Sequence, residues 1–153
     1  MNWIEIGWLA IGFLFGVTVL KSAGPIAYRF GLKVRFWIRH GRKGKPILFV
    51  YSESSNWRDE IETRILPRIE PYAVILNWSR RREWESRMQF EVKMFNQWCG
   101  PGEFVPMAIV FPVAGKVRTF RLWQLSTNPK HGKDKFSKQA EQDLLETVKQ
   151  LTR

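Results

Sequence analysis

The segment PMAIVFPVAGKVRTFRL, residues 106–122, decides the fold of this chain. Its first six residues, 106–111, form a continuous apolar run, which predicts a buried strand. Ala114-Gly115-Lys116 predicts a turn, and residues 117–122 then alternate apolar with polar side chains, as a half-buried antiparallel strand does. The segment therefore predicts a β-hairpin that joins a buried strand to a half-buried one.

Two similar apolar runs precede this hairpin, at residues 46–51 and 73–78, and each predicts a further buried strand. Between them we expect a helix that starts near Asn56, which would cap its first turn. Pro67 should kink or end this helix. Its apolar positions repeat every four residues and predict one buried face, made of Trp57, Ile61, Ile65 and Ile69.

Two more helices complete the predicted order of elements. The first follows the second strand, and its predicted apolar face consists of Trp84, Met88, Val92, Phe95 and Trp98. Ser137 is expected to cap the last helix, whose apolar stripe consists of Ala140, Leu144, Val148 and Leu151. The order β-α-β-α-β-β-α predicts an α/β domain with a mixed sheet, and residues 46–153 suffice to bury one core.

Residues 46–152 resemble the thioredoxin-like superfamily in this order of elements, in the kinked helix after the first strand, and in Val105-Pro106 before the third strand. The resemblance implies a thioredoxin-like fold with a cis Pro106 beside the active site. That superfamily places its Cys-x-x-Cys motif after the first strand, because a helix amino terminus stabilises a thiolate. Here the corresponding turn, residues 52–57, reads SESSNW. It holds no sulfur, so the redox function is not expected.

We therefore expect a binding module rather than an enzyme, with no cofactor. If it binds in the superfamily's usual place, a protein or peptide would lie in a groove between two segments, and exposed backbone beside the proline would offer β-type pairing. The expected binding residues are Ser54, Ser55, Asn56, Trp57, Val105 and Pro106. The serines have no evident general base and suit helix capping. The two His residues and one Cys are widely separated, so no metal site is expected.

A competing hypothesis is a monothiol redox enzyme that uses Cys99. The segment WCGPG, residues 98–102, looks like the superfamily's Trp-Cys-Gly-Pro-Cys. However, it follows the predicted second helix instead of preceding a helix, and Gly102 stands where the resolving cysteine would be. Catalysis by Cys99 is therefore the less favoured interpretation.

The amino-terminal segment 1–20 predicts a retained transmembrane anchor. Residues 6–20, IGWLAIGFLFGVTVL, carry no charge, and about 20 helical residues span the ~30 Å hydrocarbon core. A positive stretch before the apolar run, which a cleaved signal peptide needs, is missing. All flanking cations follow the run, so we expect the amino terminus outside and the domain in the cytoplasm. Gly12 and Gly16 are compatible with a homodimer through this helix.

Residues 21–45 are predicted to be a basic juxtamembrane linker, which separates the anchor from the domain at 46–153. They contribute +8 of the net charge of +11 and contain no acid. Gly24-Pro25 should end the anchor helix, and His40 is expected to be solvated. An anionic bilayer surface is the first candidate partner, a simple tether the second and nucleic acid the third. The residues expected at the membrane surface are Lys21, Arg29, Lys33, Arg35, Trp37, Arg39, Arg42, Lys43 and Lys45.

Overall fold

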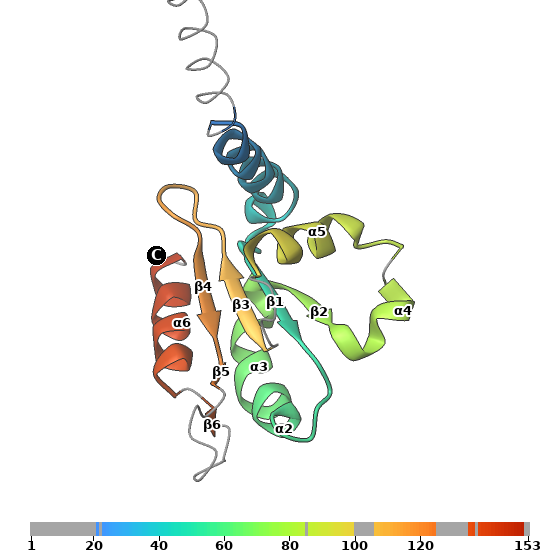
Figure 1. Ribbon diagram of the computed structural model, residues 1–153. Coiled ribbons are helices and arrows are strands. Elements are labelled where there is room, and N and C mark those ends of the chain that lie inside the picture. The colour runs from blue at the N-terminus through green and yellow to red at the C-terminus, as the bar shows by residue number, and fades with distance from the viewer. Residues whose placement is uncertain are drawn as a thin grey trace, which may run out of the picture. The chain divides into compact units, whose positions relative to one another are not determined.

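The computed structural model describes residue 21 and residues 23–84, 86–99, 106–124, 135–136 and 138–151. The chain divides into two compact units, residues 1–35 and residues 36–153. The second unit contains a four-stranded sheet in the order β2-β1-β3-β4 (Figure 1). Its strands are β1 (Ile47–Tyr51), β2 (Ala73–Asn77), β3 (Met107–Val110) and β4 (Arg118–Arg121). The predicted α/β class with a mixed sheet is confirmed.

Strand β1 lies in the interior of the sheet and is parallel to β2 and antiparallel to β3. All five of its residues are buried, as a continuous apolar run predicts. Strand β4 pairs with β3 and forms an outer edge, where Arg118, Thr119 and Arg121 are exposed. A separate two-stranded ladder joins β5 (Trp123–Gln124) to β6 (Lys135–Phe136).

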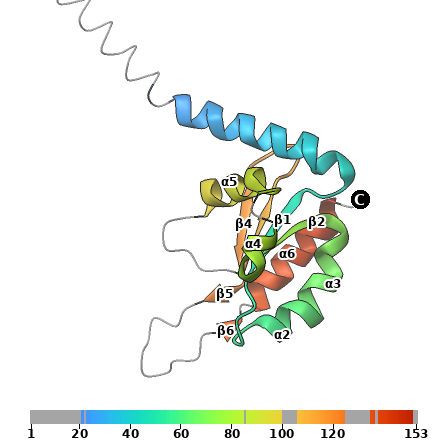
Figure 2. The same cartoon turned by 90° about the vertical axis from the view of Figure 1, so that its right-hand side faces the viewer.

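Helices cover both faces of this sheet. Figure 2 shows α5 (Gln89–Trp98) on one side and α3 (Leu66–Ile69) and α6 (Lys138–Leu151) on the other. Successive side chains of a strand point to opposite faces of the sheet, so alternate residues of β1 pack under α5 on one face and under α3 and α6 on the other. On the side of α3 and α6 the buried core cluster includes Ile47, Phe49, Ile65, Leu144 and Val148.

The helical segment after β1 has the predicted buried face. It consists of α2 (Arg58–Glu60), a π-helical turn η2 (Ile61–Ile65) and α3, and a 3₁₀ turn η3 (Glu70–Tyr72) follows. Ile61, Ile65 and Ile69 are fully buried. The helix continues through Pro67 to Ile69, because the wide turn before Pro67 accommodates the missing N–H.

The predicted cap of this helix is wrong. Helix α2 begins at Arg58, directly after Trp57, and no side chain caps it. Asn56 instead uses its backbone N–H, which points to the Ser54 hydroxyl at 3.4 Å. The chain makes a local serine turn here, so the N-cap position is Trp57, one residue later than the capping pattern indicates. Ser137, the predicted cap of α6, lies outside the described residues.

The single helix predicted after β2 is two helices, α4 (Arg81–Trp84) and α5, preceded by a 3₁₀ turn η4 (Trp78–Arg80). The Trp84 indole N–H donates to the Asn77 carbonyl over 2.9 Å, which holds α4 against the end of β2. The predicted apolar face is therefore only partly right. Helix α5 buries Glu91, Met94 and Phe95 rather than a stripe that includes Val92.

Residues 23–39 of the predicted linker are helical, so the expected end of a helix at Gly24-Pro25 is wrong. Pro25 lacks one backbone donor, whereas the residues after it keep theirs and continue the helix. A 3₁₀ turn, η1 (Gly41–Lys43), follows. None of the helices in the described residues is long and apolar enough to cross a membrane. The predicted anchor and Gly12 and Gly16 lie in residues 1–20, outside those residues.

The compact unit that contains the sheet begins at Phe36, ten residues before the predicted domain. Phe36 is fully buried, and its ring centroid lies 4.3 Å from that of Phe111, just after β3. Trp98 at the end of α5 meets the same Phe111 ring edge-on at 5.1 Å. Residues at the end of the basic segment therefore contribute to the packing of the α5 face of the sheet.

The prediction that His40 is solvated is also wrong. Its Nε2 lies 2.6 Å from Oε1 of Glu91, and Arg39 Nε lies 3.1 Å from the same oxygen. Glu91 is only 1% exposed, and its Oε2 has no hydrogen-bond partner among the described residues. A buried carboxylate is costly unless it is paired, so this contact fixes the chain before β1 to helix α5.

Candidate functional site

The parallel strands β1 and β2 have their carboxyl ends at the same end of the sheet, where α/β proteins commonly bind ligands. The loop of residues 52–57 follows β1 at this end. The register pairs Val50 with Met107, so Pro106 stands opposite Tyr51 at the same end of the sheet. We call the loop 52–57 together with Pro106 the carboxyl-end site.

The structure brings together most of the sequence-predicted binding residues at this site. Ser55 and Asn56 are exposed, whereas Ser54 and Trp57 are half-buried. The Trp57 indole N–H donates to the Ser52 carbonyl over 2.9 Å, and its ring packs against the apolar core. Trp57 therefore holds the loop in place. Val105 lies outside the described residues.

Pro106 is buried at the start of β3. Proline has no N–H, and the Pro106 carbonyl accepts a hydrogen bond from the Leu122 N–H over 3.1 Å. The Pro106 carbonyl is therefore used within the sheet, whereas Val105, whose backbone the expected β-type pairing also involves, lies outside the described residues. In the loop itself, Ser55 and Asn56 face solvent and offer a surface to a partner.

A polar network that the sequence analysis missed supports the loop from β2. The Asn77 side-chain amide donates to Glu53 Oε1 over 2.7 Å, and its carbonyl oxygen accepts from the Ser79 N–H over 3.1 Å. The Glu53 N–H in turn donates to the Ser79 hydroxyl over 2.9 Å. Polar residues directly after both predicted strands were the available signal for this network. Their hydrogen bonds tie the two strand ends together and order the site.

Tyr51, at the end of β1, completes the network. The Asn77 amide lies 3.4 Å from its hydroxyl, which is a long hydrogen bond. Burial raises the pKa of the Tyr51 phenol, and the negative charge of Glu62 raises it further. The group stays protonated at neutral pH and so cannot act as a base there.

The site has no arrangement for covalent catalysis among the described residues. Ser54 and Ser55 have no hydrogen bond to a histidine, and His40 is engaged by Glu91. A serine nucleophile needs an adjacent base, so these hydroxyls are not activated. In the described part of the chain, no three His, Cys, Asp or Glu side chains lie close enough to hold a metal ion.

Cys99 directly follows the carboxyl end of α5 and is half-buried. Its backbone N–H donates to the Phe95 carbonyl over 2.7 Å, which completes the last turn of the helix. A helix stabilises a thiolate at its amino end, through the positive end of its dipole. Cys99 stands at the opposite end, so this helix gives it no such activation.

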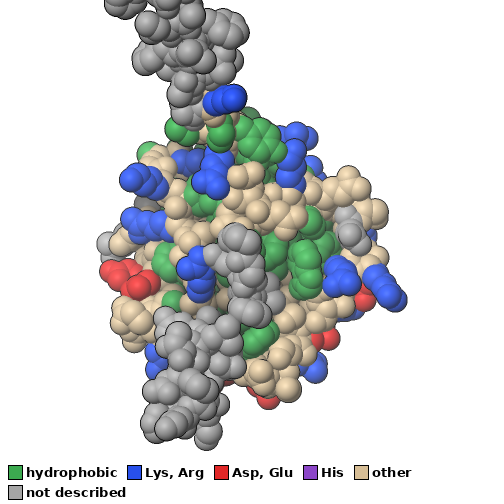
Figure 3. Space-filling view, viewed as in Figure 1, with side chains coloured by type: hydrophobic (Ala, Val, Ile, Leu, Met, Phe, Trp, Pro, Cys, Tyr) green, Lys and Arg blue, Asp and Glu red, His purple; other side chains and the backbone are tan. Residues whose placement is uncertain are grey.

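The predicted membrane-surface residues are distributed over both compact units. Lys21, Arg29 and Arg35 are exposed and Lys33 is half-buried in the first unit. In the second unit, Arg39, Arg42 and Lys43 are exposed, whereas Trp37 and Lys45 are half-buried. Figure 3 shows one face of the protein, on which Lys and Arg side chains are widespread and few Asp and Glu side chains are visible.

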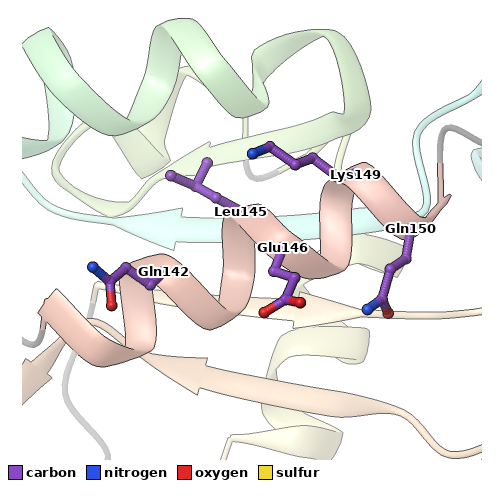
Figure 4. Close-up of a pocket in the computed structure, with 5 residues that line it drawn as sticks. All are labelled: Gln142, Leu145, Glu146, Lys149 and Gln150. Atoms are coloured by element: carbon purple, nitrogen blue, oxygen red, sulfur yellow. The ribbon is translucent and has the colours of Figure 1, made fainter.

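A further surface depression, of about 450 Å³, lies along α6. All five lining residues come from this one helix, and Figure 4 shows their side chains fanning out instead of converging. Ligand sites bring polar groups from several elements toward one point. This depression is therefore not a candidate ligand site, in contrast to the carboxyl-end site, which combines the loop 52–57 with Pro106 and is supported by residues at the end of β2.

The geometry of the carboxyl-end site is the basis for any functional conclusion. It combines a loop that exposes Ser55 and Asn56, a buried proline and an ordered polar network at one end of the sheet. Comparison of the chain with protein-family models, curated proteins and solved structures finds no match.

Proposed function

We propose that this protein is a membrane-anchored, thioredoxin-like binding module without redox activity, and that it presents the carboxyl-end site to a protein or peptide at the cytoplasmic membrane face. The observation that carries the proposal is the register of β1 and β3. It sets Pro106 beside the loop after β1, which is the pairing of segments that the resemblance to the thioredoxin-like superfamily implies.

The composition of the site favours binding over chemistry. The loop has no sulfur at the position where the superfamily places its thiols. Its polar groups bond to one another and to β2, which pre-organises the surface that Ser55 and Asn56 expose. A pre-organised surface loses little conformational entropy on binding, because its loop is already ordered.

Site-specific photo-cross-linking in native membranes tests the binding site. A photoreactive amino acid is placed at exposed Ser55 in the full chain and, as a matched control, at exposed Ala114 in the turn at the other end of the sheet. We expect discrete adducts from position 55 that Asn56→Arg abolishes. Adducts that are equal at both positions, or that survive Asn56→Arg, would contradict the assignment.

The membrane part of the proposal is supported by the distribution of charge. Residues 21–45 carry eight cations and no acid after the apolar run, and such residues orient insertion toward the cytoplasm. Protease added to sealed, wall-free cells should spare residues 36–153 and digest them once the membrane is opened. Digestion in the sealed cells would overturn the orientation.

A further inference from the structure

A concave surface lies at the opposite end of the sheet from the carboxyl-end site. We call it the amino-end pocket, a cavity of about 460 Å³ whose apolar wall is formed by Trp37, Ile47, Tyr72, Val113, Val148 and Leu151. Ile47 begins β1, and Val113 follows β3, which runs antiparallel to it. The volume is within the range of about 300–1,000 Å³ that small-molecule sites occupy.

Positive charge lies next to this pocket in the sequence. Gly41 and Gly44 line the pocket, and the two residues between them in the sequence are Arg42 and Lys43. Lys45 directly follows Gly44. Arg42 and Lys43 are exposed. No acidic side chain among the described residues forms an ion pair with any of the three cations. Their charge is therefore available to an anionic ligand.

The apolar wall is partly aromatic, and part of it is open to solvent, whereas Ile47 and Val148 are buried. Val113 is 72% exposed and Leu151 37% exposed, while Trp37 and Tyr72 are half-buried. A Cβ atom at Gly41 would come within 2.5 Å of the Trp37 ring, so glycine at this position lets the indole lie against the chain. Amphipathic rings, an exposed apolar rim and adjacent cations are the combination that binds at the bilayer interface.

We propose that the amino-end pocket binds an anionic phospholipid of the bilayer. Part of an acyl chain lies against Trp37, Tyr72 and Val113, and the headgroup phosphate is held by Arg42 and Lys43. Charge complementarity favours this ligand, since a zwitterionic lipid or a cationic peptide would leave the cations uncompensated. The inference rests on the anchor of the proposed function and is independent of partner binding at the carboxyl-end site.

The direction of the chain gives a second argument. The pocket is at the end of the sheet where β1 begins, so the chain arrives there directly from the basic segment. Trp37 is the seventeenth residue after the predicted anchor, which ends at residue 20. The lipid of the anchor's own membrane is therefore the amphiphile that the chain order brings to this pocket at high local concentration.

Photo-cross-linking with lipids tests this proposal on the full chain mixed with phosphatidylcholine vesicles. One sample contains phosphatidylglycerol with a photoreactive acyl chain, and the other contains phosphatidylcholine with the same acyl chain. We expect cross-links on peptides that contain Trp37, Tyr72 or Val113, with a yield roughly tenfold higher for the anionic lipid. Equal yields for the two lipids, or cross-links confined to residues 21–35, would overturn the pocket.

Matched variants separate the pocket from general attraction to the membrane. Arg42→Gln/Lys43→Gln should lower the cross-linking yield roughly tenfold, whereas Arg81→Gln/Arg82→Gln, which removes the same charge at the other end of the sheet, should not. Equal losses in the two double variants would overturn the assignment.

Val113→Asp adds a charge to the exposed rim and should abolish the cross-links, while Ala114→Asp at its exposed neighbour should preserve them. Flotation of the vesicles is measured in the same samples. A chain that floats without pocket cross-links overturns lipid binding alone, whereas a chain that does not float overturns the anchor as well.

Discussion

Replacement of Phe36 by alanine should strongly lower the free energy of unfolding of residues 36–153, although the sequence predicts that this residue lies in a linker. The Phe36 side chain is fully buried and lies against Phe111 at 4.3 Å. A phenylalanine buries about 200 Å², and at about 25 cal/mol per Å² this corresponds to roughly 5 kcal/mol. Truncation leaves the Cβ atom but opens a cavity, so we expect a loss of about 3–5 kcal/mol.

Guanidinium unfolding of the full chain in a mild detergent, followed by tryptophan fluorescence, measures this loss. Ile38→Ala is the matched control, because Ile38 is 54% exposed and two residues away on the same helix. It should change the free energy of unfolding by no more than about 0.5 kcal/mol. If Phe36→Ala has an equally small effect, residues 36–45 behave as a linker and our account of the packing is refuted.

Three further predictions concern other contacts of the same unit. Gly41→Ala should destabilise this unit by about 1–3 kcal/mol, because the new methyl group would come within 2.5 Å of the Trp37 indole ring. Gly31→Ala, where nothing lies within 4 Å of the added Cβ atom, should cause no such loss, and thermal unfolding of the two variants measures the difference. Glu91→Gln should lower the free energy of unfolding by about 1–3 kcal/mol through loss of its buried charged contacts, and Glu83→Gln, in an exposed ion pair, by less than about 1 kcal/mol. Because the pKa of the Tyr51 phenol is raised in the folded chain, this phenol loses its proton at a lower pH in the unfolded chain than in the folded one. Its contribution to stability is therefore retained below about pH 10 and is lost above it. The melting temperature should decline less steeply with pH in Tyr51→Phe than in the unsubstituted chain, and identical declines in the two would contradict the buried phenol.

The strands were predictable from the sequence because their signal is local. Each of the predicted apolar runs at 46–51, 73–78 and 106–111 contains a strand of the sheet, since a strand buried on both faces needs a continuous apolar run. The face of the first helix was equally clear from three isoleucines at a spacing of four. Both inferences depend only on neighbours within one element.

Contacts between distant segments were not predictable in the same way. His40 and Glu91 are 51 residues apart, and neither residue type indicates a buried partner. The break between α4 and α5 depends on a hydrogen bond from Trp84 to the end of β2, which no periodicity contains. At the carboxyl-end site, Ser54 to Trp57 were found through the resemblance, whereas the support from Asn77 and Ser79 required the register of two strands.

The outer strand β4 has a consequence for how copies of this protein behave when they meet at high concentration. An edge strand offers free N–H and C=O groups that another sheet can extend, which leads to aggregation. Here that strand is only four residues long and exposes Arg118 and Arg121 on either side of its centre. Two copies meeting edge to edge would bring their Arg118 guanidinium groups together, and the repulsion between these like charges disfavours a continuous sheet between copies.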